Sequence, residues 1–207
     1  MSELPLNDRI ALVVGASRGI GYESALALAK AGAHVIATDI DERALWPAYQ
    51  KAYQAVLDAA DAAYAIVKPG IRFREIHAEA MKVLVSRLHE WGLLPVSVEE
   101  AVSDEGGQHR RWMPHGTSHH LGLDVHDCAQ AKRELYIDGI IEEGMVFTIE
   151  PGLYFKEDDL AVPEEYRGIG VRLEDDVLIT ADGAQNLTAA LPRTTEEIEA
   201  WMAELAG

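Results

Sequence analysis

One segment organises the whole sequence: His115-Gly-Thr-Ser-His-His-Leu-Gly-Leu-Asp-Val-His-Asp127. Imidazole and carboxylate side chains are the ligands and proton-transfer groups of hydrolytic metal sites. The segment supplies both kinds within a short stretch of chain, from His115, His119, His120, Asp124, His126 and Asp127. It therefore indicates a metal-dependent hydrolytic site.

Two acidic motifs follow, each carried by an apolar run. A strand that delivers Glu150 into a Pro-Gly turn is predicted for Met145-Val-Phe-Thr-Ile-Glu-Pro-Gly-Leu-Tyr154. A second strand, over residues 168–180, is expected to carry Glu174. Arg172 and Glu174 lie two residues apart, so the period of a strand places both on one face. Strands are rigid supports, which suits a coordination site.

With these three motifs the chain resembles the creatinase, prolidase and aminopeptidase P group, which are dinuclear metallopeptidases with the pita-bread fold. The match covers residues 46 to 207, and the motifs stand in the family's order. The resemblance implies that His119 is the imidazole ligand of a metal ion. It also implies that Glu150 and Glu174 are carboxylate ligands.

The remaining motif residues receive supporting roles from the same resemblance. His115 and His126 match positions that bind substrate and stabilise the tetrahedral intermediate, and Glu150 would also shuttle protons. Arg172 matches an arginine that orients the site. His120 is instead expected to be a surface or packing residue.

Each residue taken alone also has an ordinary structural interpretation. A single histidine on a strand is usually a hydrogen-bonded core residue, and an acidic pair such as Asp175-Asp176 is usually solvated. Three motifs in one order make coincidence a poor explanation for all of them.

The upstream half of the family's site is missing from this sequence. The complete site has five protein ligands, and two of them are aspartates from the first half of the domain. Residues 46–114 contain only Asp58, Asp61 and Asp104, none in the family's aspartate-bearing strand pattern. We therefore expect weak binding of a single divalent ion, manganese, cobalt or zinc, because three protein ligands and water suffice for some sites.

Composition restricts the partners and the compartment. The formal charge of −17 over 207 residues argues against nucleic acid or an anionic membrane surface as a partner. Cys128 is the only cysteine, so an internal disulfide is excluded and a reducing compartment fits. No signal peptide or membrane span is recognisable, and the expected location is the cytoplasm.

A β-α-β unit is predicted for residues 1–44, outside the stretch that resembles the metallopeptidases. Short apolar runs at 10–14 and 33–38 flank an alanine-rich helix that ends near Gly32. The glycine pattern resembles the start of a short-chain dehydrogenase/reductase, which binds NAD(P). The positions that this resemblance assigns to the cofactor are Gly15, Ser17, Arg18, Gly19, Gly21 and Asp39.

The rest of that dehydrogenase family is absent. Tyr64-Ala-Ile-Val-Lys68 matches its catalytic pair, but Tyr64 continues a helical apolar stripe and Lys68 precedes Pro69-Gly70, where the helix must stop. We reject this pair, and neither NAD(P) binding nor dehydrogenase activity is expected. The glycine loop is expected to persist as structure alone.

The elements expected from residue 45 onward give an α+β pattern. One helix starts at Trp46-Pro47 and runs to Val67, and a second runs from Phe73 to Trp91. A loop with an exposed His109 is predicted for residues 103–111. The three motif strands are expected to form one antiparallel sheet. A final helix begins with a capping box at 194–197 and is expected to bury Ile198, Trp201, Met202 and Leu205.

These expectations combine into one architecture, of mixed α+β and α/β class. A Rossmann-type β-α-β unit, residues 1–44, packs as one body on half of a pita-bread domain, residues 45–207. The N-terminal strands would cover the exposed sheet edge left by the missing half. The chain would then be a chimera, made by design or recombination.

Three functions remain open. The first is a metal-binding remnant with little or no Xaa-Pro peptidase activity. The second is an active metal-dependent Xaa-Pro aminopeptidase, acting on a proline-containing peptide, in which Asp39 and Asp41 replace the lost carboxylates. The third is an NAD(P)-binding module without dehydrogenase activity.

Overall fold

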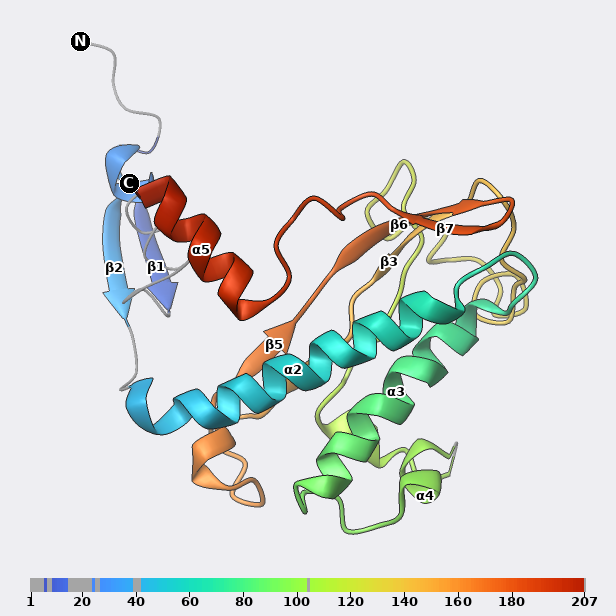
Figure 1. The fold of residues 1–207 in the computed structure, drawn as a ribbon, viewed down its shortest axis with the longest axis horizontal. Helices are drawn as coiled ribbons and strands as arrows, with labels where there is room; N and C mark the ends of the chain where they lie inside the picture. The colour runs from blue at the N-terminus through green and yellow to red at the C-terminus, as the bar shows by residue number, and fades with distance from the viewer. Residues whose placement is uncertain are drawn as a thin grey trace. The chain divides into compact units, whose positions relative to one another are not determined.

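The computed structural model describes residues 6, 9–14, 24, 27–38, 42–103 and 105–206. The chain divides into two compact units (Figure 1). One comprises Met1–Ala44 together with Pro192–Gly207, and the other comprises Leu45–Leu191. Within the described ranges, no helix has both the length and the apolar character that a membrane span requires.

The first unit contains a parallel strand pair. Strand β1 (Ile10–Val14) pairs with β2 (His34–Thr38), with Ile10 opposite His34 and Val14 opposite Thr38. Both strands lie where the sequence predicts them. Gly32 has φ +99°, a left-handed conformation suited to the predicted helix end. The predicted cofactor-binding glycines, together with Ser17, Arg18, Asp39 and Asp41, lie outside the described residues.

Helix α5 (Thr195–Ala206) also belongs to the first unit. Its predicted capping box is confirmed: the Glu197 N–H donates to Thr194 Oγ1 at 3.2 Å, and the Thr194 N–H donates to Glu197 Oε2 at 3.0 Å. The predicted burial of its apolar stripe is wrong, because Trp201 is 43% and Leu205 66% exposed. Helical periodicity identifies an apolar face, but it does not supply a surface that covers this face.

Two long helices support the second unit. Helix α2 (Glu42–Ile66) begins before the predicted start at Trp46, and Pro47 lies inside it. Proline removes one intrahelical hydrogen bond there, which the apolar stripe that follows outweighs. Helix α3 (Phe73–Glu90) agrees with its prediction, and Gly92 beyond its end has φ +72°. The apolar stripe of α3 was expected to face the core, and all its members except the half-buried Trp91 are buried: Phe73, Ile76, Ala80, Leu84 and Leu88.

Two small antiparallel sheets carry the acidic motifs. The first has the order β3-β6-β7, from β3 (Val146–Ile149), β6 (Asp175–Thr180) and β7 (Gly183–Asn186). The second pairs β4 (Gly152–Tyr154) with β5 (Gly170–Arg172). The strand predicted over 168–180 is therefore interrupted, and Glu174 lies in the gap between β5 and β6.

The histidine segment is not the full third strand that the sequence predicts. It forms an isolated antiparallel bridge between His120 and Phe147. Around this bridge the backbone N–H groups of Thr148, Glu150 and Leu121 donate to the carbonyl oxygens of residues 119, 117 and 146. Residues 117–121 thus run along the edge of β3 opposite to β6.

Short helices occupy the stretch before the histidine segment. Helix α4 (Val98–Val102) is followed by a 3-10 helix, η1 (Gln108–Arg111), where a loop was predicted. A second 3-10 helix, η2 (Glu164–Tyr166), precedes β5. The prediction of an exposed His109 is wrong, since it is 8% exposed and its Nδ1 donates to the Ala101 carbonyl at 2.9 Å. Helix α4 provides the acceptor.

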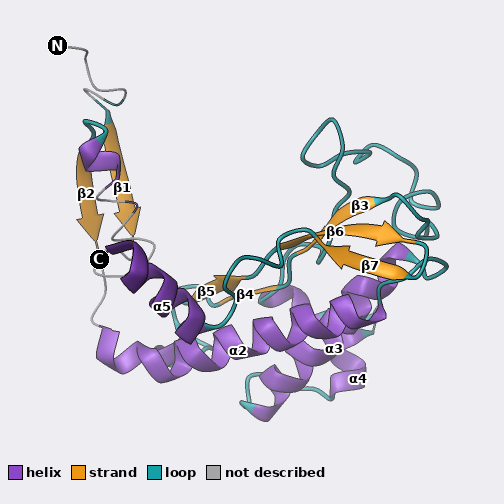
Figure 2. Cartoon of the chain, turned by 45° about the horizontal axis from the view of Figure 1, so that its top comes forward, coloured by secondary structure: helices purple, strands orange, loops and turns teal. Residues whose placement is uncertain are grey.

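The core of the second unit lies between its helices and the β3-β6-β7 sheet (Figure 2). Phe147 on β3 is fully buried and meets the ring of Phe73 edge-on, with centroids 5.4 Å apart. On α2, the hydroxyl of Tyr64 donates to the Ala184 carbonyl in β7 at 2.8 Å. Tyr64 therefore serves packing, as its place in the helical stripe predicts.

Replacing Phe147 with alanine tests this core. We expect Phe147→Ala to lower the free energy of unfolding by about 3–5 kcal/mol, because it leaves a cavity between α3 and the sheet. Urea denaturation of the metal-free protein measures the loss. Leu160→Ala, at a position 83% exposed, is the matched control and should change stability by less than about 0.5 kcal/mol. Equal effects of the two substitutions would contradict this description of the core.

Candidate metal centre

Three predicted ligands converge in the second unit. His119, Glu150 and Glu174 each offer a ligand atom, and these atoms all lie within 4.8 Å of one another. His119 comes from the segment along β3, Glu150 directly follows β3, and Glu174 lies between β5 and β6. Residues 55 positions apart in sequence are thus brought together by the pairing of neighbouring strands.

Backbone hydrogen bonds fix two of these residues on a common edge. The Thr148 N–H donates to the His119 carbonyl at 3.0 Å, and the Glu150 N–H donates to the Thr117 carbonyl at 2.6 Å. Buried hydrogen bonds of this kind are costly to break. The register between residues 117–121 and β3 therefore determines that His119 faces Glu150.

The Thr148 side chain adds a second connection between the same two residues. Its Oγ1 accepts the His119 N–H at 3.1 Å and donates to Glu150 Oε1 at 3.4 Å. Thr148 is 1% exposed. A threonine in an apolar strand carries no functional signal in the sequence, so the motif analysis did not single it out.

The hydrogen bonding of His119 leaves one ring nitrogen directed at a carboxylate. Its Nδ1 lies 3.2 Å from the His120 carbonyl, which can only accept, so Nδ1 carries the proton. In a neutral ring Nε2 then has a lone pair, and it lies 3.3 Å from Glu150 Oε1. Both of these atoms can serve as ligands of a cation. A backbone acceptor on the other ring nitrogen is typical of metal-binding histidines.

The two carboxylates differ in exposure and share one arginine. Glu150 is 8% exposed, whereas the side chain of Glu174 is 43% exposed. Arg172 Nη1 lies 3.6 Å from Glu150 Oε2, and its Nε lies 4.0 Å from Glu174 Oε2. The predicted shared face of Arg172 and Glu174 is thus retained although the strand is interrupted. The arginine partly offsets the repulsion between the two carboxylates.

His115 and His126 flank this cluster without joining it. His115 Nδ1 donates to the Gly116 carbonyl at 2.7 Å, and its Nε2 accepts the hydroxyl of Tyr154 at 2.7 Å. Burial raises the pKa of the Tyr154 phenol above its usual value. The rings of His119 and His126 have centroids 4.3 Å apart. A hollow of about 640 Å³ opens beside these two rings.

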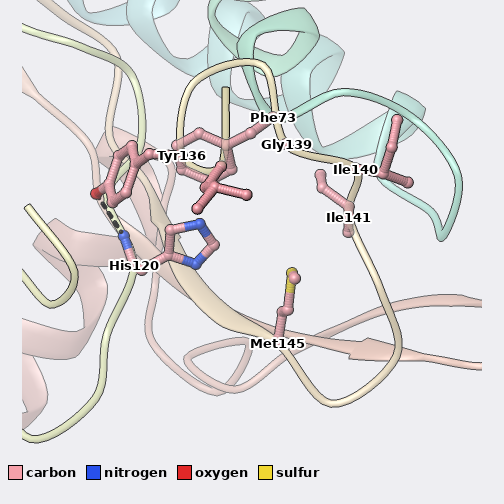
Figure 3. Close-up of a pocket in the computed structure, with 8 residues that line it drawn as sticks. Phe73, His120, Tyr136, Gly139, Ile140, Ile141 and Met145 are labelled. Carbon is pink, nitrogen blue, oxygen red and sulfur yellow. Dashed lines mark hydrogen bonds between the residues drawn. The ribbon is translucent and has the colours of Figure 1, made fainter. Parts of the chain in front are cut away.

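His120 is half-buried and packs against the core, one of the two roles predicted for it (Figure 3). Its ring stacks on Phe73 with centroids 4.5 Å apart, and its backbone N–H donates to the Tyr136 hydroxyl at 3.1 Å. Burial lowers the pKa of His120, so the neutral ring is favoured. The neighbouring histidines 119 and 120 therefore point into different environments, as adjacent residues of a strand do.

No further acidic residue completes the cluster within the described residues. Asp58 belongs to α2, where it accepts from Gln54 at 2.8 Å and from Arg87 at 3.1 Å. Asp61 also belongs to α2. Asp104 lies outside the described residues.

A residue that the sequence analysis missed supports the histidine segment from α3. His77 Nδ1 accepts the Thr117 N–H at 3.2 Å and lies 2.9 Å from Thr117 Oγ1. Burial is the main cause that lowers the pKa of His77 from its ordinary 6.5 to about 4, followed by the nearby charges of His109, His115 and Arg110. A lone histidine beside Ile76 on a helix has no motif around it, so no sequence signal marks it.

Comparisons with known proteins agree with this geometry. The model of metallopeptidase family M24 matches residues 23–181. Xaa-Pro aminopeptidase 1 of Streptomyces coelicolor is 58% identical over 158 residues, 76% of this chain and 32% of that protein. The structure of proline aminopeptidase P II from Yersinia pestis superposes with TM-score 0.69 at 41% identity, covering 76% of this chain and 35% of that one.

A zinc-substituted Escherichia coli aminopeptidase P in complex with product is also similar, with TM-score 0.68 and 41% identity. The alignment covers 75% of this chain and 34% of that structure. The chain spans about a third of the length of the relatives that it matches.

The low pKa of His77 gives stability a specific pH dependence. Below pH 6.5 His77 becomes protonated in the unfolded chain, whereas in the folded chain it stays neutral down to about pH 4. The free energy of unfolding therefore falls as the pH falls through this window. At pH 5 the loss from this one group is about 2 kcal/mol. An asparagine at this position does not titrate. Between pH 8 and pH 5 the unfolding free energy of His77→Asn should therefore fall by about 2 kcal/mol less than that of the wild type. Urea denaturation with a chelator present measures both. Equal falls in both proteins would contradict the assignment.

Proposed function

Because this chain belongs to metallopeptidase family M24, we propose that it binds one divalent metal ion in the remaining half of an aminopeptidase site. Its similarity to solved aminopeptidase P structures extends to the mixed α/β pita-bread architecture with antiparallel sheets. His119, Glu150 and Glu174 are the proposed ligands. The single observation that carries the proposal is their convergence within 4.8 Å.

The donor set fits a metal ion of the manganese, cobalt or zinc class. One imidazole and two carboxylates, completed by water, match the ligand sets of some three-residue sites. His119 Nε2 lies beside Glu150 Oε1, so a cation placed there would bind to both atoms. A second ion would need further carboxylates, and none joins the cluster among the residues that the structure describes. We therefore propose a single ion held weakly.

The surrounding residues supply binding and proton-transfer groups. A bound ion would supply Lewis-acid polarisation of a carbonyl group and a water molecule of lowered pKa. Glu150 is placed to accept and return a proton, with Arg172 holding its second oxygen. His126, whose ring centroid lies 4.3 Å from that of His119, is the imidazole proposed to donate toward a developing oxyanion. Both ring nitrogens of His115 are already engaged, so this side chain is better placed to fix Tyr154.

Little or no peptidase activity is proposed for the chain. Xaa-Pro aminopeptidase relatives suggest a proline-containing peptide as the substrate class. Residues 46–114 lack the two aspartate ligands that the resemblance implies, so the chain would bind such a peptide without the two-ion activation of water that dinuclear hydrolases use. The alternative is that Asp39 and Asp41 supply the lost carboxylates and restore turnover.

Calorimetry with zinc, cobalt and manganese tests the metal proposal. We expect at most one ion per chain, with a dissociation constant above about 1 μM, and His119→Ala should abolish this binding. His89→Ala is the matched control, because His89 is an exposed histidine on α3 and should leave the affinity unchanged. Submicromolar binding of two ions would overturn the proposal.

Hydrolysis of a proline-containing dipeptide separates the two catalytic alternatives. We expect no turnover above the uncatalysed rate at saturating zinc, cobalt or manganese. Turnover that is abolished by both Glu150→Ala and Asp39→Asn would instead support the active enzyme. Glu157→Ala, at an exposed acidic residue outside the cluster, controls for a general effect of lost charge.

For the N-terminal unit we propose structural persistence of a dehydrogenase-like fragment, so that the chain is a chimera of two fragments, made by design or recombination. The parallel pairing of β1 and β2 supports this origin. An NAD(P)-binding module is the alternative for Gly15, Gly19, Gly21 and Asp39. Titration with NAD, followed by tryptophan fluorescence, tests it, and we expect no saturable change.

A further inference from the structure

We propose that His77 is a positioning residue of the metal centre, which acts through Thr117 to hold Glu150 and the His119 segment in place. The inference rests on the proposed metal site for its functional consequence. The structural part of it stands on hydrogen bonds among His77, Thr117 and Glu150.

These hydrogen bonds form a continuous path from helix α3 to a proposed ligand. His77 Nδ1 accepts the Thr117 N–H at 3.2 Å and faces the Thr117 hydroxyl at 2.9 Å. On the other side of the same residue, the Thr117 carbonyl accepts the Glu150 N–H at 2.6 Å. Thr117 is thus held between the helix and the residue that follows β3.

Thr117 depends on His77 because it is completely buried. Its exposure is 0%, so water cannot replace a lost partner. Among the described residues, its N–H and hydroxyl both find their hydrogen-bond acceptor in His77 Nδ1. A buried donor without an acceptor carries a desolvation penalty. Without His77, residues 117–121 would therefore be driven to shift along β3 or away from it.

The geometry also defines which atom of His77 matters. Because the Thr117 N–H points at Nδ1, that nitrogen must be unprotonated, and the ring is the neutral Nε2–H tautomer. His77 does not belong to the ligand cluster itself. We assign its effect to the hydrogen bonds through Thr117, so an acceptor at the δ position should reproduce it.

Two substitutions distinguish the role of His77 as a hydrogen-bond acceptor from its role in filling space. The Oδ1 of asparagine lies at the same branch position as Nδ1 of histidine, so His77→Asn retains the acceptor. His77→Leu fills the space but offers no acceptor. Because His77→Leu could unfold the protein, Thr117→Val serves as a further variant that removes only the hydroxyl donor while keeping the side-chain shape.

The first measurement is amide hydrogen exchange of the metal-free protein, read by NMR at Thr117 and Glu150. His77→Leu should speed exchange at both amides by at least about tenfold, and His77→Asn should stay within about threefold of the wild type. Thr117→Val should speed exchange at Glu150 to an intermediate extent. Amides in the middle of α2 report whether global stability has changed.

The second measurement is cobalt affinity from the visible absorption of the bound ion. His77→Leu should weaken binding by about 10-fold or more, as the loss of a residue supporting a ligand does, and His77→Asn should restore it. If the wild type binds no cobalt, the proposed function fails, while the exchange data still decide the role of His77. If His77→Leu and His77→Asn behave alike in exchange, whether both protected or both unprotected, the inference is overturned.

Discussion

The register between residues 117–121 and strand β3 is the constraint on which the site depends. Hydrogen bonds from Thr148 to the His119 carbonyl and from Glu150 to the Thr117 carbonyl fix that register. On its other edge β3 pairs with β6, which places Glu174, the residue just before β6, beside the same cluster. A one-residue slip would turn His119 to the opposite face and dissolve the cluster.

The charges of the clustered side chains favour the binding of a cation. Two carboxylates and an imidazole lone pair are held together, with only the half-exposed guanidinium of Arg172 as a positive neighbour among the residues described around them. Like charges at such distances disfavour one another unless a proton or cation is added. The fold therefore assembles a set of donor atoms suited to a cation. Asp58 of α2 is engaged elsewhere, in an ion pair with Arg87.

The convergence of His119, Glu150 and Glu174 could be predicted from the sequence, because these residues lie in long, ordered motifs. The helix from Phe73 also follows from simple periodicity. Residues that act through packing could not be predicted: Thr148 and His77 carry no motif, and their roles arise from contacts with residues distant in sequence. The exposure of Trp201 and the burial of His109 were mispredicted because neither helical periodicity nor loop composition says which other elements cover a side chain.

The number and kind of atoms around a bound metal test the central claim most directly. X-ray absorption spectroscopy of the protein loaded with one and then two equivalents of zinc provides this measurement. The account predicts one imidazole and oxygen ligands around a single ion, with no metal–metal scattering at about 3.5–4 Å at either loading. A metal–metal distance in that range, or a coordination shell without imidazole, would contradict it.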